Sequence, residues 1–176
     1  MRRAVWLLPT ALVLAACGVT PTAPVRVGEP ATGIQEPGTS RHTVRLYFLS
    51  PFGIYPVARS EPSDATPQRA VDLLLAGPTP AERARGLITE VPWNLGRVTA
   101  TAAPGAVDLV LPVPVSTLQP AAVSQLACTA AAAGAPGGSP VTGTGIRIHE
   151  PGAAAPWTLR CSSTGYAFPV PEATPS

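Results

Sequence analysis

The sequence contains no lysine and few aromatic residues. Its 12 basic residues are all arginines, and Phe, Trp and Tyr together make up 5% of the chain. Arg2 and Arg3 stand at the very start, so the remainder carries 12 − 2 = 10 arginines against 10 acidic residues. A chain with balanced charge, no basic run and few aromatic side chains lacks both the positive surface and the stacking surface that nucleic acids need. We therefore exclude nucleic-acid binding.

The sequence also lacks the local motifs of common hydrolases and metal sites. It has no G-x-S-x-G or S-x-x-K motif, and its two histidines, His42 and His149, have no companion ligand at metal-binding spacing. We expect both histidines to be solvated residues near a strand end or a turn. Asp72 and Glu90 could act as an acid–base pair only if the fold brought two carboxylates together. We therefore expect no metal, no cofactor and no catalytic residue.

The N-terminal apolar run is too short to cross a membrane. It extends from Ala4 to Leu14 and contains Pro9, whereas a spanning helix needs about 20 apolar residues. Arginines precede the run and small residues follow it, which is the three-part layout of a secretory signal. We expect residues 1–16 to be a signal peptide that is not part of the fold.

The signal ends in Leu14-Ala15-Ala16-Cys17, which resembles the lipobox of bacterial lipoproteins. In such proteins the Cys thiol receives diacylglycerol and becomes the new N-terminus, so we expect lipidation of Cys17. The acyl chains would hold the protein at the outer face of the cytoplasmic membrane. Residues 17–41 are rich in Pro, Gly and Thr and would form a tether. The alternative is an ordinary signal with an incidental cysteine.

The two remaining cysteines, Cys128 and Cys161, are expected to form a disulfide. Export would place them in an oxidising compartment, and they are the only two left once Cys17 carries lipid. The bond would stabilise a small domain by roughly 4 kcal/mol. A metal or redox pair is the alternative, but neither cysteine has a companion at ligand spacing.

Hydrophobic patterns predict five units in one domain over residues 42–168, followed by a tail at 169–176. Alternating apolar residues separated by turn sequences predict hairpins, and apolar stripes with start and stop signals predict helices. The order is hairpin (42–60), helix (66–77), hairpin (97–111), helix (118–132) and hairpin (145–162). We therefore predict an α+β fold, β-β-α-β-β-α-β-β, with two main helices packed on one face of antiparallel hairpins.

The segment LLAGPTPAERARGLITEVP, residues 74–92, is typical of a helix stop followed by a capped restart. Thr79-Pro80-Ala81-Glu82 matches the capping box, in which the Thr and Glu side chains each bond the other residue's backbone N–H. Capping accounts for Glu82 but does not require Arg83 or Arg85. We expect any partner contact here to pass through those two arginines and Trp93.

Trp93 could also form an aromatic surface with three residues of the first hairpin, Tyr47, Phe52 and Tyr55. Burial in the core is the commoner fate of such side chains. If they are exposed and contiguous, they favour a binding surface.

Several segments together resemble the GerMN domain of sporulation and spore-germination proteins, which also occurs in actinobacterial envelope lipoproteins. They are TVRLYFL, IYPVARS, AVDLLLAGPTPAERARGLITEVP, RVTATAAPGAVDLVLP, AVSQLACTAA and GIRIHE, and they span about residues 42–162. The family's acidic position after the second hairpin turn is kept as Asp108. The resemblance implies an α+β fold outside the membrane with a binding or assembly role and no enzymatic activity.

The use of arginine alone, with abundant Ala, Gly, Pro and Val, is typical of GC-rich genes and indicates an actinobacterial source.

From these observations we expect a lipid-anchored, non-catalytic module that binds an envelope protein or a peptidoglycan component, with a link to sporulation or cell-wall processes. One alternative is an extracytoplasmic hydrolase that acts on cell-wall glycan or peptide. Another is an accessory regulator of a membrane sensor kinase. Only the proteins with which members of the family are associated in actinobacteria suggest this alternative.

Overall fold

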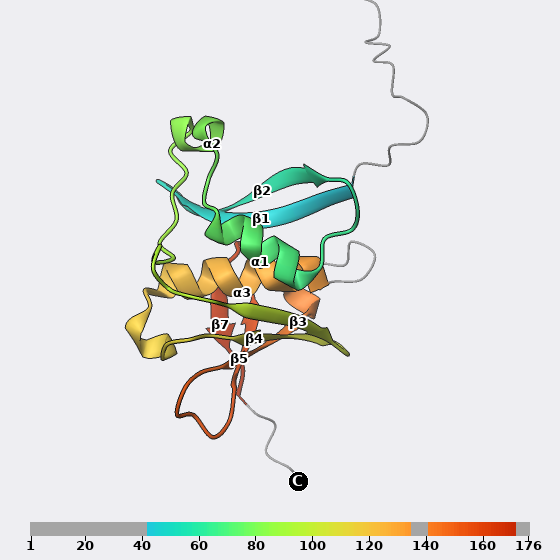
Figure 1. Ribbon diagram of the computed structural model, residues 1–176, viewed down its shortest axis with the longest axis vertical. Coiled ribbons are helices and arrows are strands. Elements are labelled where there is room, and N and C mark those ends of the chain that lie inside the picture. Colours follow the sequence, from blue (N-terminus) through green and yellow to red (C-terminus); the bar gives the residue numbers. More distant parts are fainter. Residues whose placement is uncertain (1–41, 135–140, 172–176) are drawn as a thin grey trace, which may run out of the picture. The chain divides into compact units, whose positions relative to one another are not determined.

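The computed structural model describes residues 42–134 and 141–171 (Figure 1). The predicted signal peptide, Cys17 and the tether lie outside these residues, as does most of the predicted tail. Within the described ranges, no helix is long and apolar enough to cross a membrane.

The described chain is a mixed α+β structure with two sheets. The strands are β1 (His42–Ser50), β2 (Gly53–Glu61), β3 (Thr99–Ala103), β4 (Ala106–Val110), β5 (Gly145–His149), β6 (Trp157–Cys161) and β7 (Ala167–Pro169). The helices are α1 (Pro67–Leu75), α2 (Pro80–Ala84) and α3 (Pro120–Gly134), with short 3-10 turns η1 (Val115–Thr117) and η3 (Val141–Gly143).

Strands β1 and β2 form a separate antiparallel hairpin, as predicted. They pair in register from His42 opposite Glu61 to Ser50 opposite Gly53. Gly53 has a φ of 115°, a conformation that glycine adopts at little cost and other residues rarely adopt. The turn is closed by the Ser50 hydroxyl, which donates to the Gly53 carbonyl (2.8 Å) and accepts from the Phe52 N–H (3.2 Å).

The other five strands form one sheet in the order β3-β4-β5-β6-β7. The pairs β3–β4 and β5–β6 are antiparallel, which confirms the second and third predicted hairpins. However, β4 and β5 pair in parallel, from Ala106 opposite Gly145 to Val110 opposite His149. The sequence analysis predicted the hairpins but not this parallel pairing between two of them. The chain between these two strands contains α3, and such a crossover connection is what parallel neighbours require.

Helix α3 lies between the hairpin and the five-stranded sheet (Figure 1). It contacts β1 on one side and β4 and β6 on the other, and α1 packs beside it with contacts to both β1 and β3. The helices are thus covered by strands on two sides, so the predicted packing on one face only is wrong. The helix begins at Pro120 because proline is well suited to the first turn, where no N–H partner is needed.

The position between two layers explains the composition of α3. Most of its residues are buried, and small alanines allow strands to approach from both sides. Its buried polar residues are Ser124, Gln125 and Thr129. Each of them hydrogen-bonds to backbone outside the helix, which satisfies the rule that buried polar groups need partners.

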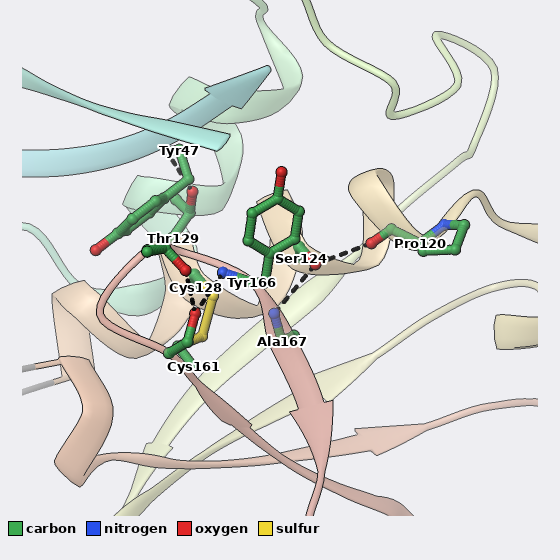
Figure 2. The surroundings of a disulfide bond; sticks show 10 residues. Tyr47, Pro120, Ser124, Cys128, Thr129, Cys161, Tyr166 and Ala167 are labelled. Atoms are coloured by element: carbon green, nitrogen blue, oxygen red, sulfur yellow. Dashed lines mark hydrogen bonds between the residues drawn. A yellow bond between two sulfur atoms is a disulfide. The ribbon is translucent and has the colours of Figure 1, made fainter. Parts of the chain in front are cut away.

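The predicted disulfide between Cys128 and Cys161 is present and joins α3 to β6 (Figure 2). The two Cα atoms lie 5.7 Å apart, and both residues are buried. On the same helix, the Thr129 hydroxyl accepts from the Tyr47 N–H (3.0 Å), and the Ser124 hydroxyl accepts from the Ala167 N–H (3.1 Å). Helix α3 therefore connects β1, β6 and β7.

Strand β7 extends beyond the boundary that we predicted for the domain. Pro169 pairs with Leu159, and the Val170 N–H donates to the Thr158 carbonyl (2.9 Å). The predicted tail was expected to begin at Pro169. The short strand has little hydrophobic alternation of its own and contains a proline, so local pattern did not reveal it.

Candidate functional site

The candidate site is the corner formed by α2, the loop that follows it and the turn of the β1–β2 hairpin. Its foundation is the predicted capping box, which is confirmed. The Thr79 hydroxyl accepts from the Glu82 N–H (3.3 Å), and the Glu82 carboxylate accepts from the Thr79 N–H (2.7 Å). Pro80 occupies the first turn, where its missing N–H leaves no bond unmade.

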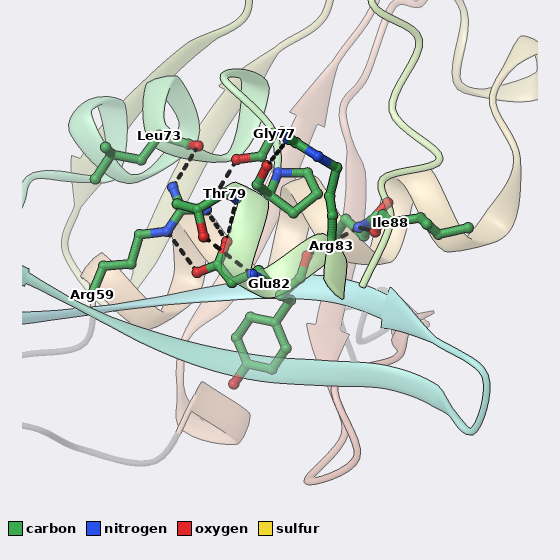
Figure 3. A network of polar contacts seen from close by, with 10 residues as sticks. Arg59, Leu73, Gly77, Thr79, Glu82, Arg83 and Ile88 are labelled. Carbon is green, nitrogen blue, oxygen red and sulfur yellow. Dashed lines mark hydrogen bonds and ion pairs between the residues drawn. The ribbon is translucent and has the colours of Figure 1, made fainter. Parts of the chain in front are cut away.

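Glu82 has a second role that the sequence did not reveal (Figure 3). It forms a bidentate ion pair with Arg59 of β2, with Nε–Oε1 at 3.0 Å and Nη2–Oε2 at 2.5 Å. The same guanidinium donates to the carbonyl of Gly77 (3.0 Å) and to that of Leu73 (3.4 Å) at the end of α1. Its central carbon lies 5.3 Å from the centroid of the Phe48 ring, within cation–π range.

These contacts fix the charge state of the corner. The hydrogen bonds from Arg59 lower the pKa of the Glu82 carboxyl below its ordinary value, although burial opposes them, and the bond from the Thr79 N–H adds to the lowering. The carboxylate is therefore ionised at neutral pH and fully engaged. Glu82 is a structural residue of this corner.

The loop after α2 is attached to the hairpin turn. Leu49 and Ile88 exchange two backbone hydrogen bonds of 2.9 Å each, so residue 88 acts as a one-residue strand beside β1. Gly86 lies against Pro51, and a methyl group at Gly86 would be 3.6 Å from the Pro51 ring. Gly86 also has a φ of 81°, the left-handed conformation in which glycine commonly ends a helix.

The predicted contact residues Arg83, Arg85 and Trp93 are all exposed in this corner. The Arg83 guanidinium donates to the Pro78 carbonyl, so this arginine also supports the start of α2 (Figure 3). Trp93 is 96% exposed.

The fold buries one of the four residues of the predicted aromatic surface and exposes the other three. Tyr47 is buried at 3% exposure, because its backbone bonds to α3 and its side chain packs against the chain near Gly165. Phe52 is 100% exposed and Tyr55 is 46% exposed.

Two further residues, Ile88 and Tyr166, lie around the turn. The sequence analysis did not identify them. Ile88 is 50% exposed beside Leu49. Tyr166 is partly exposed, and its hydroxyl lies so close to Gly53 that a methyl group there would be 2.6 Å from the oxygen. We call Phe52, Ile88, Tyr166 and Arg85 the turn patch. Its members come from three distant segments, which is why spacing in the sequence could not identify them.

A second polar cluster lies on the five-stranded sheet. Asp108 of β4 accepts two hydrogen bonds from Arg147 of β5, at 2.7 and 2.6 Å, and its Oδ1 lies 3.0 Å from Nε2 of His149. The prediction that His149 is simply solvated is therefore incomplete. The bonds from Arg147, and secondarily that from His149, lower the pKa of Asp108 to about 2 against the opposing effect of burial.

This cluster depends on the parallel pairing of β4 with β5, which places Asp108 directly opposite Arg147. The alternation in GIRIHE does put Arg147 and His149 on one face, and this signal could have suggested that they act together.

Across residues 42–134 and 141–171, no group of three or more Cys, His, Asp or Glu side chains could hold a metal ion.

No protein-family model, curated protein or solved structure matches this chain. The resemblance to the GerMN domain therefore stays a prediction.

Proposed function

We propose that the protein is a lipid-anchored, extracytoplasmic lipoprotein whose GerMN-like domain is a non-catalytic contact module of the cell envelope. Cys17 carries the lipid, residues 1–16 are the signal peptide, and residues 17–41 tether the domain. The proposal includes a role in sporulation or cell-wall processes, which only the family resemblance suggests.

The observation that carries the extracytoplasmic assignment is the Cys128–Cys161 disulfide. It is buried and joins the central helix to the sheet. Disulfides in such positions form and persist in oxidising compartments and are rare in the cytosol. This supports the export that the N-terminal sequence predicts.

The contact role is supported by the exposed side chains of the candidate site. A fully exposed Phe52 and a nearly fully exposed Trp93 do not contribute to the core of the domain. Arg83 of α2 and Arg85, which follows the helix, are exposed as well. Exposed aromatic and arginine side chains are the residues most enriched in contact surfaces.

The anchor is tested by the mass of the protein isolated from the membrane fraction of its host. We expect a chain that begins at Cys17 and carries acyl groups. In Cys17→Ser the thiol is lost, so the variant should retain residues 1–16 and carry no acyl mass. A matched variant, Thr20→Ala, should be processed like the wild type. Cleavage at another position, with Cys17 unmodified, would refute the anchor.

The contact surface is tested by photo-crosslinking in intact cells. A photoreactive phenylalanine analogue at position 93 should give adducts with an envelope component. The same analogue at position 110, a partly exposed site on the five-stranded sheet, should give none. Equal adducts from both positions would show that the corner has no special role.

A further inference from the structure

We propose that the turn patch inserts into the surface of an anionic phospholipid bilayer. This inference rests on the proposed function, because the lipid on Cys17 would bring the domain to that bilayer, and it names the partner of the same corner. The patch combines two apolar side chains, an amphipathic tyrosine and an arginine, which is the composition of segments that lie in a membrane interface.

The turn holds its apolar residue in place before any contact is made. Phe52 stands at the tip of a two-residue turn that is closed by both hydrogen bonds of the Ser50 hydroxyl. The neighbouring residue Pro51 has a restricted backbone and packs against Gly86. The Phe52 side chain is fully exposed, and hydrogen bonds and packing already hold the turn that carries it. Insertion into a bilayer would therefore require little further ordering of the backbone.

The other members of the patch surround that tip. Ile88 is joined to Leu49 by two backbone bonds, next to the last residue of β1. The Tyr166 hydroxyl lies against Gly53, so the polar end of this side chain adjoins the other end of the turn. Tyrosine is favoured where one end of the side chain meets hydrocarbon and the other meets water.

The charges near the patch favour an anionic surface. Arg83 and Arg85 are exposed, whereas the carboxylate of Glu82 is buried and paired with Arg59. Glu90, half-buried, is the remaining acidic residue of the loop. The arginines therefore exceed the available carboxylates, and each arginine near an anionic bilayer contributes favourably to binding.

The test uses the mature chain from residue 17 onward with Cys17→Ser, so that no acyl chain contributes. Binding is measured by sedimentation with vesicles of phosphatidylcholine alone and with vesicles that also contain phosphatidylglycerol. We expect binding to the second kind only, weakened by added salt. Phe52→Ser should lower the partition coefficient roughly tenfold, and Arg85→Gln about fivefold.

Matched controls lie on the five-stranded sheet. Val110→Ser removes a partly exposed apolar side chain, and Arg160→Gln removes an exposed arginine, so both should bind like the parent chain. Thermal unfolding confirms that each variant is folded. No binding to phosphatidylglycerol vesicles, equal binding to both kinds of vesicle, or equal binding by Phe52→Ser and its parent would overturn the inference.

A cell experiment separates lipid from protein. A photoreactive analogue at position 52 of the full chain should form adducts with phospholipid. Adducts with a protein instead would overturn the membrane assignment and leave the proposed contact module standing. The Cys17 processing experiment tests the anchor independently, so the two proposals can fail separately.

Discussion

The hairpin β1–β2 and the five-stranded sheet are joined to the same helix, α3, by different kinds of bond. The sheet is joined covalently, through Cys128 and Cys161, and also by the hydrogen bond that the Ser124 hydroxyl accepts from the Ala167 N–H. The hairpin is joined by hydrogen bonds of Tyr47, whose N–H donates to the Thr129 hydroxyl and whose carbonyl accepts from Gln125. Arginine–carboxylate pairs occur in both layers. On the hairpin, the pair of Arg59 with Glu82 is largely buried, and a second pair, Arg69 with Glu61, is more exposed. On the sheet, Asp108 and Arg147 lie on a solvent-accessible part of the surface.

The difference follows from the size of the two layers. A two-stranded hairpin is at best marginally stable by itself, so its outer backbone groups and its ends need partners from elsewhere in the chain. Gln125 donates to the Tyr47 carbonyl of β1 and to the carbonyl of Ile88, which itself pairs with Leu49 of that strand. Arg59 of β2 joins the hairpin to the end of α1 through the Gly77 carbonyl. The five-stranded sheet pairs most of its own backbone. Its charged pair is therefore less important for stability.

The largest expected effect comes from removing the covalent link. The variant Cys128→Ala/Cys161→Ala should lose about 4 kcal/mol of unfolding free energy, because the reduced chain gains loop entropy when unfolded. Urea unfolding monitored by circular dichroism measures the loss, and the wild type in reductant should reproduce it. A loss below about 1 kcal/mol would mean that hydrogen bonds alone hold the sheet to α3.

Breaking the buried ion pair should have the next largest effect. Arg59→Ala leaves the Glu82 carboxylate buried without its partner and should cost about 3 kcal/mol. Arg45→Ala, an exposed arginine on the neighbouring strand, is the control and should change little. The double variant Arg59→Met/Glu82→Gln keeps the capping box without charges and should recover part of the loss. If it is less stable than Arg59→Ala, the pair is not the reason for the loss.

The first hairpin, the capping box and the disulfide could be predicted because each depends on local pattern or on counting cysteines. Thr79 and Glu82 are three residues apart, so the start of a helix is enough to bring their side chains to each other's backbone N–H groups. Arg59 lies 23 residues from Glu82, and only the folded hairpin brings them together. Asp108 and Arg147 depend on a parallel pairing across α3, which no local signal specifies. The turn patch was missed for the same reason, although two of its members, Phe52 and Arg85, were noted as candidates.

A smaller loss of unfolding free energy is expected when Gln125, which hydrogen-bonds to the hairpin, is replaced. In Gln125→Leu, the Glu90 N–H and the Tyr47 carbonyl lose this partner, whereas the Ile88 carbonyl keeps its bond from the Leu49 N–H; the substitution should cost about 2 kcal/mol. Gln68 of α1 plays the equivalent part for β3, where it bonds the Ala100 N–H and the Val98 carbonyl. Because Gln68 is only half-buried, water can replace it, and Gln68→Leu should cost less. Equal losses, measured by urea unfolding, would contradict this comparison.

The smallest expected effect is the pH dependence of the sheet cluster. The pKa of Asp108, about 2 in the folded protein, lies below its ordinary value of 3.8. Its stabilisation is therefore present above pH 3.8 and is lost as the pH falls through 2. Because the pair is open to solvent, Asp108→Asn should cost only about 1 kcal/mol at pH 7. The gap between variant and wild type should close near pH 2 in urea unfolding, and a gap independent of pH would refute this role.

The double role of Glu82 also has a consequence for local motion. A helix of five residues cannot persist in water by itself, so α2 exists only while Arg59 and the capping box hold it. The end of β2, α2 and the chain up to Ile88 should therefore open and close as one unit, and their amide protons should exchange with solvent at a common rate. An opening of that unit would separate Arg85 and Ile88 from the turn that carries Phe52. The contact surface is then available only while this small cooperative unit is closed.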